Sequence, residues 1–443
     1  VPFGLPDGWA WVRLGNLSAA IQYGLSNSAE PQGTHRLLRI TDIQDGKVDW
    51  NAVPFTTVND PEAYLLKTGD IVFARTGATV GKSFLITETP YPSVYASYLI
   101  RIRLLGSLSP EYIYQFFDSA CYWSQITDKS VGVGQPNCNG TSLKELFIPL
   151  PPISEQLRIV PTAQALLAYV AKIDAEKKSL LSIIMATKSK ILDLAIRGQL
   201  IPQDPNDEPA SVLLERIRAE KEELIKQGKI KRDKKESVIF RGEDNSYYLN
   251  NGQTTVDIND DLPFDIPDSW RWVRLKDVFI INPRNKLDDD LDVSFIPMPL
   301  IDDGYSGKHA TEVRHWKEVK NGFTHFAEGD VGVAKITPCF ENRKSTVFEN
   351  LTNGYGAGTT ELHVLRPFGN NIFVQYLLAY IKSDYFVEKG KQTFTGDVGQ
   401  QRISKAYVES AYFPLPPVKE QERIVQQIGI IFEFLNMIMD ALS

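Results

Sequence analysis

The chain has little of the chemistry on which most enzymes and secreted proteins depend. Its 443 residues include five histidines and only three cysteines, Cys121, Cys138 and Cys339. Three widely spaced cysteines do not make a disulfide framework, and this usage is typical of a reducing compartment. Neither a CxxC pair nor an HExxH motif occurs, so a zinc site has little support. We therefore expect a cytoplasmic protein that holds no metal.

Long apolar stretches are lacking as well. No run of about twenty apolar residues is found, so the sequence predicts no membrane-spanning segment. The start, VPFGLPDGW, has neither the basic nor the apolar region of a signal peptide. The formal charge of −7 is unfavourable for nucleic-acid binding if the charge is evenly spread. Residues 67–103, however, carry more Lys and Arg than Asp and Glu, so local basic patches leave that function open.

Catalytic motifs are absent, and the one stretch that resembles such a motif does not fit it. There is no GxSxG, no GxGxxG after a strand, and no cluster of carboxylates. RTGATVGKS, residues 75–83, resembles a phosphate-binding P-loop, but only three residues separate Gly77 from Gly81. The FLITE that follows is typical of a strand, whereas a P-loop leads into a helix. We predict a hairpin or loop between strands, and a nucleotide hydrolase using Lys82 and Ser83 is a disfavoured alternative.

What the chain does contain is one sequence pattern written twice. VPFGLPDGWAWVRLGNL at 1–17 recurs as LPFDIPDSWRWVRLKDV at 262–278. FIPLPPISEQLRIV at 147–160 recurs as YFPLPPVKEQERIV at 412–425, and KTGDIVFAR recurs between them as AEGDVGVAK. Matches that are long and in the same order indicate an internal duplication.

Each copy predicts a strand-dominated α+β domain. The alternation of Trp9, Trp11 and Arg13 is typical of a strand with one buried face, and short β-branched runs follow. Helical patterns come near the end of each copy, at 110–126 and 371–386. The predicted organisation comprises a first domain at 1–152, a helical spacer and charged linker at 153–261, a second domain at 262–417, and a C-terminal spacer helix at 418–443.

A heptad pattern follows each copy and predicts long helices. Gly198 marks the end of the first helix. The second helix is shorter, which fits either a trimmed chain or a short distal region. We expect the two to pair as an antiparallel coiled coil that separates the domains with pseudo-two-fold symmetry, although each helix packing on its own domain is an alternative. The predicted packing positions are Ile159, Leu166, Val170, Ile173, Leu180, Ile184 and Ile191 in the first helix, and Ile424, Ile428, Ile431, Leu435 and Ile438 in the second.

Residues 203–251 predict a capped helix followed by a charged, mobile linker. A solvated linker is favoured over a phosphate-binding strip, since runs of charge are usually solvated.

The two copies diverge at two corresponding places. RTGATVGKSFLI stands opposite KITPCFENRKSTVF, and GQPNCN stands opposite GQQRIS. Two surfaces that read different targets would differ in this way, and these side chains can bond phosphates or base edges. The candidate DNA-binding residues are Arg75, Thr76, Lys82, Ser83, Gln135 and Asn137 in the first copy, and Lys335, Thr337, Arg343, Lys344, Gln400 and Arg402 in the second.

The chain resembles the specificity subunit of Type I restriction-modification systems. The resemblance is carried by the paired PDGWAWVRL and PDSWRWVRL openings, by PLPPISEQLRIV and PLPPVKEQERIV, and by GDIVFARTGATVGKS. It extends through ILDLAIRGQLIPQDPNDEPASVLLERIRAEKEEL and so covers nearly the whole chain.

This resemblance implies a non-catalytic subunit that binds double-stranded DNA. Each of two target recognition domains would read one half of a bipartite site, and the helices would set the spacing and dock two methylation subunits. S-adenosylmethionine is then expected on those subunits, and ATP and Mg on a separate restriction and translocase subunit. The alternative is a coiled-coil scaffold whose twin domains bind proteins or glycans.

Overall fold

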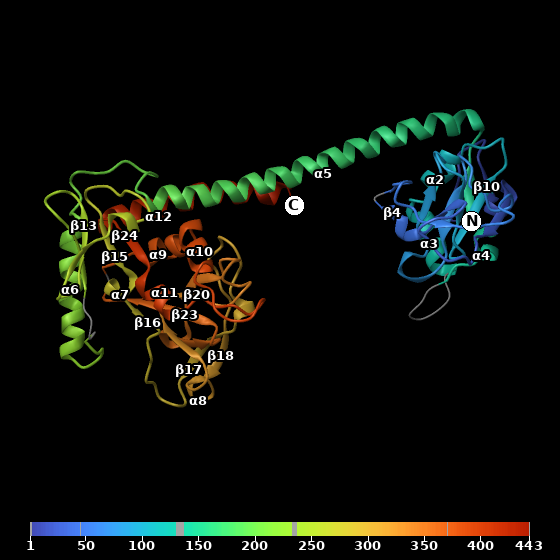
Figure 1. Cartoon of the computed structure of the whole chain (residues 1–443). Helices are drawn as coiled ribbons and strands as arrows, with labels where there is room; N and C mark the ends of the chain where they lie inside the picture. The colour runs from blue at the N-terminus through green and yellow to red at the C-terminus, as the bar shows by residue number, and fades with distance from the viewer. Residues whose placement is uncertain (1, 45, 130–136, 233–236, 370, 443) are drawn as a thin grey trace. The chain divides into compact units, whose positions relative to one another are not determined.

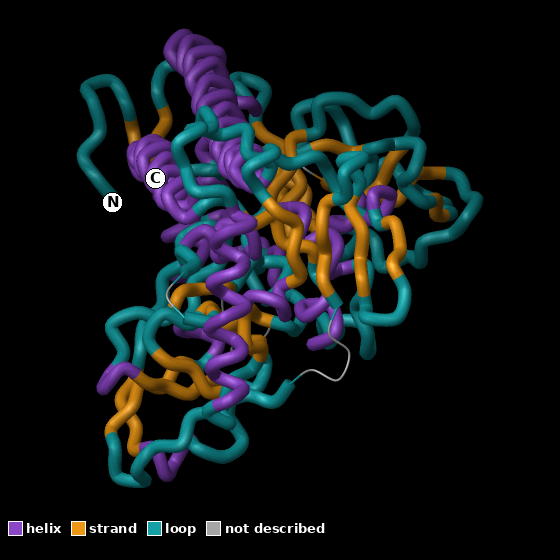
Figure 2. Tube along the Cα trace, turned by 90° about the vertical axis from the view of Figure 1, so that its left-hand side faces the viewer, coloured by secondary structure: helices purple, strands orange, loops and turns teal. Residues whose placement is uncertain are grey.

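The structure is a computed structural model that describes residues 2–44, 46–129, 137–232, 237–369 and 371–442. Two compact units are present, Val1–Ala175 and Glu176–Ser443, and each is described by itself. Figure 1 labels their helices and strands, and Figure 2 distinguishes strands from helices by colour.

The first unit is built on two small sheets. One sheet has four strands in the order β2-β10-β7-β8, the other has three in the order β6-β3-β9, and β1 pairs separately with β11. The strands are β1 Ala10–Arg13, β2 Ser18–Tyr23, β3 His35–Leu38, β4 Ile43–Gln44, β5 Lys47–Val48, β6 Phe55–Thr56, β7 Ile71–Ala74, β8 Ser83–Leu85, β9 Ser93–Tyr95, β10 Leu99–Leu104 and β11 Phe147–Leu150. The α-helices are α1 Leu14–Leu17, α2 Pro110–Phe116, α3 Ala120–Lys129, α4 Gly140–Lys144 and the start of α5 Ile153–Ile196.

The second unit repeats the four-stranded sheet and the separate strand pair, and its other sheet has one strand more. Its sheets have the orders β16-β23-β20-β21 and β18-β17-β22-β19, and β15 pairs with β24. The corresponding pairs β3–β9 and β17–β22 are both parallel. The strands are β15 Arg271–Arg274, β16 Phe279–Ile281, β17 Asp292–Ile296, β18 Glu312–His315, β19 Thr324–Ala327, β20 Val331–Ala334, β21 Ser345–Val347, β22 Tyr355–Gly358, β23 Leu362–Pro367 and β24 Tyr412–Leu415. The α-helices after the linker are α7 Leu275–Val278, α8 Trp316–Val319, α9 Val374–Ile381, α10 Asp384–Lys391, α11 Lys405–Ser410 and α12 Val418–Leu442.

The repeated Gly-Asp pair forms the same buried turn in both units. The carboxylate of Asp70 accepts a hydrogen bond from the Lys67 backbone N–H and binds the Arg103 guanidinium at 2.6 Å. Asp330 does the same with the Ala327 N–H and with Arg366, at 2.7 Å. Both carboxylates are 2 % exposed or less, so each needs this partner to offset its desolvation. The duplicated residues therefore stabilise the entry into β7 and β20.

The duplicated tryptophan also has one role in both units. The Trp9 indole Nε1 donates to Glu155 at 3.1 Å, and the Trp270 Nε1 donates to Glu420 at 2.9 Å. These bonds tie the opening strand of each copy to the helix that closes it. Beneath them lies a separate apolar core in each unit.

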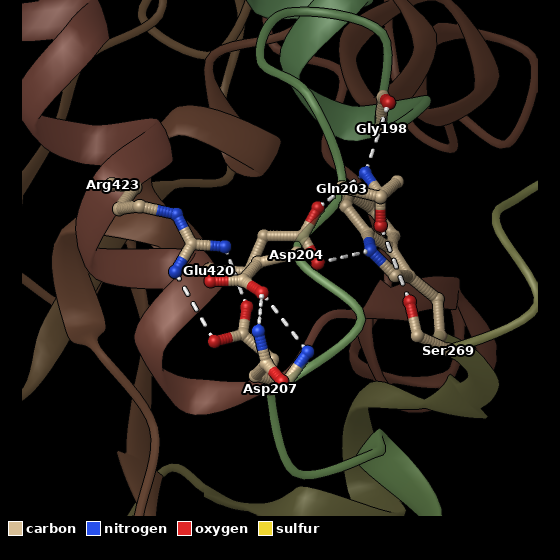
Figure 3. Close-up of polar contacts among 9 residues, drawn as sticks. Gly198, Gln203, Asp204, Asp207, Ser269, Glu420 and Arg423 are labelled. Atoms are coloured by element: carbon tan, nitrogen blue, oxygen red, sulfur yellow. Dashed lines mark hydrogen bonds and ion pairs between the residues drawn. The ribbon is translucent and has the colours of Figure 1, made fainter.

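The C-terminal half of α5 packs against α12 in the second unit (Figure 1). Lys188 Nζ donates to Asn436 at 2.6 Å, and Gln203, beyond the end of α5, donates to Glu420 near the start of α12 (Figure 3). Residue numbers decrease along α12 in the direction in which they increase along α5, so the two helices run antiparallel. Gly198 has φ +69°, which confirms it as the end signal of α5.

Burial along this seam is uneven. Ile184 and Ile191 are buried, as are Ile424 and Ile428, while Ile431 and Leu435 are partly buried. Ile159 is partly buried against the core of the first unit instead. Leu166, Val170, Ile173, Leu180 and Ile438 are 38–62 % exposed, so their packing remains a prediction.

The expectation of a mobile linker after the central helix is wrong for residues 238–257. Helix α6, Ala210–Lys226, forms as expected, but a three-stranded sheet follows, with β12 Val238–Arg241, β13 Tyr247–Asn250 and β14 Thr255–Asp257. Ile239 and Ile258 join Trp272 in a small apolar cluster. Burial of these few side chains explains why a charged segment is ordered.

Helix α12 is the most apolar of the long helices. Among the described helices, α12 is long and apolar enough to cross a membrane by length and composition alone, with a mean hydropathy of 1.3. Its polar positions are spaced through the helix, so it contains no continuous run of about twenty apolar residues. One face of α12 packs on α5, as described above.

Candidate nucleic-acid interface

The RTGATVGKS stretch is the connection of a β-hairpin, as the sequence predicts. Strands β7 and β8 pair antiparallel, with Phe73 opposite Ser83. A short 3-10 turn, Gly77–Thr79, joins them, and Gly77 and Gly81 take the positive φ values of +73° and +90° that favour glycine. Strand β8 follows Lys82, so this stretch does not lead into the helix with which a P-loop holds a phosphate. The geometry therefore does not fit the P-loop on which the nucleotide-hydrolase alternative depends.

The second divergent segment of the first unit lies directly beside this hairpin. Thr76 and Asn137 form an antiparallel bridge, and the Cys138 backbone N–H donates to the Arg75 carbonyl at 3.0 Å. The Arg75 guanidinium lies over the Tyr23 ring, 4.9 Å from its centre, which fixes its direction. Its Nε atom is buried and has no hydrogen-bond partner in the described part of the chain. Gln135 lies outside the described residues.

A groove adjoins this hairpin. Lys82 and Ser83 line it together with Gln44, Asp118 and Trp123, among others. Lys82 is exposed and Ser83 is partly exposed. The groove therefore offers a cation, hydroxyl and amide groups, an aromatic face and one carboxylate to a ligand.

The second unit brings its two divergent segments together in the same manner. Ile336 bridges to Arg402, the Ile403 N–H donates to the Lys335 carbonyl, and the Thr337 N–H donates to the Gln401 carbonyl. In the sequence these two segments are far apart, and each is recognised only as a place where the two copies diverge. The fold joins them because β20 ends where the chain returns toward α11.

Several of the second unit's candidates are already engaged. Arg343 pairs with Asp384 and donates from Nε to the Lys382 carbonyl at 3.0 Å. Lys344 Nζ donates to the Ile301 carbonyl at 2.7 Å. Burial, with the charge of Arg343 adding to it, lowers the pKa of Lys382 to about 7. These contacts hold the loop in shape, so Arg343 and Lys344 have less freedom to bind a ligand than the sequence suggests.

Arg402 is engaged as well, while Gln400 is exposed. The Arg402 guanidinium binds Glu361 through two hydrogen bonds of 2.9 and 3.0 Å, and this raises its pKa further above its ordinary value. A guanidinium held in this way keeps one fixed orientation.

The structure adds candidates that sequence reasoning missed. Val398, in the loop before Gln400, is 96 % exposed, and an apolar tip of this kind can contact a thymine methyl group. A separate groove is lined by five cations, Lys221, Lys231, Lys276, Arg284 and Lys405, and by one carboxylate, Glu409. The charged segment within residues 203–251 contains two of these lysines, but only folding brings the other cations beside them.

Metal ligands do not gather in the part of the chain that the structure describes. No group of three or more His, Cys, Asp or Glu side chains there is placed to hold an ion.

Comparison with known proteins identifies the family. A family model described as the Type I restriction modification DNA specificity domain matches residues 6–183 and 267–439. The chain belongs to this family. Its two matched ranges follow the two sequence repeats, so the chain carries two such domains of mixed helices and strands, together with a long helix.

Two curated relatives in this family each match about half of the chain. The specificity subunit of the Type I restriction enzyme EcoAI of Escherichia coli is 48 % identical over 243 residues, or 55 % of this chain and 38 % of that protein. The EcoEI specificity subunit of Escherichia coli is 46 % identical over the same length and shares. The match thus spans well under half the length of either relative.

Solved structures share the fold over the whole chain. The HsdS subunit from Thermoanaerobacter tengcongensis is 18 % identical, with a TM-score of 0.56, and the alignment covers 100 % of this chain and 93 % of that one. A chain from a structure on complex assembly of the type I R-M system is 19 % identical, with a TM-score of 0.61 and coverages of 100 % and 94 %. At these identities the likeness concerns the fold alone.

Proposed function

We propose that the chain is the DNA-recognition subunit of a Type I restriction-modification complex, and that each unit reads one half of a bipartite target. One observation carries the proposal. In both units, the two segments that differ between the repeats lie side by side, next to a four-stranded sheet that has the same strand order in the two units. Two domains that recognise different DNA sequences need the same framework with different loops paired on it.

Within the first unit, Arg75, Thr76, Lys82, Ser83, Gln135 and Asn137 are proposed to contact DNA. Lys82 and Asn137 are the most exposed of the described members, so they are proposed to reach base edges or phosphates directly. Arg75, held over Tyr23, is proposed to act at the base of the loop.

Within the second unit, Lys335, Thr337, Gln400 and Arg402 are proposed as readers, joined by the exposed Val398. Arg343 and Lys344 are proposed to support the loop, since both bond groups of their own unit. The groove with five cations is proposed to hold DNA phosphates, because clustered Lys and Arg side chains displace counterions from the DNA on binding.

The helices are proposed to act as a spacer. The antiparallel contact of α5 with α12 supports a coiled coil that sets the distance between two half-sites, with the units related by pseudo-two-fold symmetry. The exposed apolar positions of α5, from Leu166 to Leu180, are proposed to dock two methylation subunits.

The chemistry is proposed to lie on the partners. S-adenosylmethionine would bind the methylation subunits, while ATP and Mg would bind a restriction and translocase subunit. The chain itself is proposed to be non-catalytic and cytoplasmic. Its family membership and the hairpin geometry of its P-loop-like stretch support this division.

The test is selection from a random duplex DNA library, with the chain co-expressed beside a methylation subunit. We expect a split motif with an unread gap. Exchange of residues 75–83 and 134–139 for the loops of a relative should change one half of the motif only. A contiguous motif, a change in both halves, or no enrichment would contradict the proposal.

A further inference from the structure

In both units the second divergent segment leads into a short helix through the same backbone contacts. Helices α4 and α11 are each capped by the side chain of the residue before them. One residue before each cap, a backbone N–H donates to the first divergent segment, from Cys138 to the Arg75 carbonyl at 3.0 Å and from Ile403 to the Lys335 carbonyl at 2.9 Å. This backbone arrangement is common to both units, so a difference in how the segments are held has to come from side chains.

In the first unit, the side chain that reaches this junction is Tyr23, at the end of β2. Its hydroxyl accepts a hydrogen bond of 2.9 Å from the N–H of Gly140, the first residue of α4. That N–H has no partner within the helix, and Gly140 is buried, so Tyr23 satisfies a group that would otherwise be unpaired. The Tyr23 ring also lies under the Arg75 guanidinium. One side chain of the framework thus contacts the first divergent segment and the helix that follows the second.

In the second unit, the same junction is held by His363 on β23. Its Nε2 donates to the Ile403 carbonyl at 3.3 Å, and its Nδ1 accepts from the Asn282 amide at 3.2 Å. The tautomer follows from these partners, because a carbonyl only accepts and Asn282 Oδ1 is already bound by the Val364 N–H at 2.9 Å. His363 is 4 % exposed, so both ring nitrogens have the partners that burial requires.

These two side chains do not occupy corresponding positions in the repeat. On the central strand of the sheet, the place of His363 is taken in the first unit by Ile100, which is 0 % exposed. The place of Tyr23 is taken in the second unit by Pro283, which has no hydroxyl. The shared fold therefore forms with an aliphatic side chain at one position and a proline at the other. Each polar side chain occurs only in the unit whose segments it holds.

We propose that Tyr23 and His363 are positioning residues, each of which sets the orientation of the two divergent segments in its own unit. This inference rests on the proposed function, since the orientation matters because these segments read DNA. Neither residue has to contact DNA. Each fixes the backbone from which the reading side chains project, and different segments are supported from different positions of one framework.

The charged groups around His363 favour its neutral form. Burial lowers the pKa of His363 below its ordinary value of 6.5, against the effect of the carbonyl that it binds, and the charges of Lys335 and Lys405 lower it further. Glu409 raises it, and Glu361 lies nearby but is paired with an arginine. The neutral ring is therefore the form that holds the segment at neutral pH.

Protonation removes this support. A proton on Nδ1 would face the N–H of the Asn282 amide, so that contact would become a repulsion between two donors. Because the pKa of His363 is lowered in the folded unit, the contact is complete above the ordinary value of 6.5 and is lost as the pH falls through the folded value. The Tyr23 contact has no such dependence in this range, since a phenol ordinarily titrates near pH 10.

Binding to DNA tests the proposal one half-site at a time. The probe is duplex DNA with the split motif selected by the full chain and a methylation subunit, compared with versions in which one half is scrambled. Tyr23→Phe should lower discrimination about fivefold in the first unit's half only, and His363→Ile should do the same in the other half only. The isoleucine is the residue that the first unit has at this position. Tyr355→Phe, the same change at an exposed tyrosine, should alter neither half.

The pH profile separates positioning by His363 from a general loss of stability. His363→Gln keeps an amide N–H for the Ile403 carbonyl but does not titrate. Second-half discrimination should fall several-fold from about pH 7.5 to about pH 5.5 in the unsubstituted chain and stay constant in this variant. Lys382, with a pKa of about 7, is present in both, so a profile caused by Lys382 would persist in the variant.

Hydrogen–deuterium exchange provides a measurement that needs no DNA. Tyr23→Phe should speed exchange at the start of α4, and His363→Ile should speed it at the start of α11. Faster exchange without a split DNA motif would contradict the proposed function and leave the structural support intact. Unchanged exchange in both variants, an equal loss of discrimination in both halves, or the same pH profile in the chain and in His363→Gln would overturn the positioning roles.

Discussion

The first and second units form the same Gly-Asp turn and the same Trp-Glu bond, yet they surround these features differently. Asp70 binds Arg103 as Asp330 binds Arg366. The Trp-Glu bond is partly exposed in the first unit and sealed in the second. The contacts within the framework are therefore the same in both copies, whatever segment covers it. The burial of the Trp-Glu bond, in contrast, depends on the neighbouring segment.

The loops teach the complementary lesson. Each unit pairs its two divergent segments through backbone contacts, which do not require particular side chains. The side chains in those segments are therefore free to differ, and only the way the segments meet is preserved.

The largest expected effect comes from breaking the shared ion pair. Asp70→Ala or Asp330→Ala leaves a partly buried arginine unpaired and should cost about 3–5 kcal/mol of unfolding free energy in its own unit. Hydrogen–deuterium exchange of β7 and β20 under rising denaturant separates the two units. Asp60→Ala, at an exposed site, is the control. A loss of similar size in the unit without the substitution would contradict independent frameworks.

The tryptophans should respond unequally. Trp270→Phe removes the donor to buried Glu420 and should cost about 2–3 kcal/mol, as expected for a hydrogen bond to a charged group. Trp9→Phe should cost less than about 1 kcal/mol, because water reaches partly exposed Glu155. Denaturant midpoints measured for each unit test the difference, and equal costs would mean that burial does not separate the two sites.

Single loop substitutions should separate the two readers. Lys82→Ala is expected to cost about 1–3 kcal/mol of discrimination in one half-site, and Gln400→Ala the same in the other. Binding to DNA libraries randomised in one half at a time measures each effect. Lys178→Ala should change neither half. If either loop substitution altered both halves equally, the assignment of one half to each unit would be wrong.

The effect expected to be smallest over a single pH unit is a rise of stability with pH in the second unit. The pKa of Lys382 is lowered from 10.5 to about 7, so the unfolded chain binds more protons between these values. Stability of the second unit should therefore rise with pH across this window, by at most about 1.4 kcal/mol per pH unit.

Lys382→Met should flatten this rise. The corresponding residue of the first unit is Asp118, whose pKa burial raises from 3.8, and it contributes no rise of this kind between pH 7 and 10.5. Urea unfolding at a series of pH values provides the measurement. A slope that persists in the Lys382→Met variant would assign the effect to another group.

Much of this molecule can be read from its repeats. The duplicated openings, the hairpin at 75–83, the paired short helices near the end of each copy and the long helix ending before Gly198 all follow from local patterns of side chains. The sheet at 238–257 was missed because its strands are short and charged, and only contact with Trp272 orders them.

The candidate site divides in the same way. The sequence identified the two divergent segments of each copy, since a comparison of the two repeats shows where their residue types differ. It did not show that Arg343 and Lys344 bond groups in their own unit, nor that five cations line one groove.

The sequence by itself determined the duplication, the framework residues and the positions of variable loops, because these depend on spacing and residue type along the chain. Only the tertiary structure decided which loops meet, which cations are engaged, and that Trp270 is fully buried while Trp9 is partly exposed. Those properties arise from contacts between residues far apart in sequence, such as Gln203 with Glu420. The free energy of such a contact depends on how deeply its polar groups are buried, and no local sequence pattern indicates that burial.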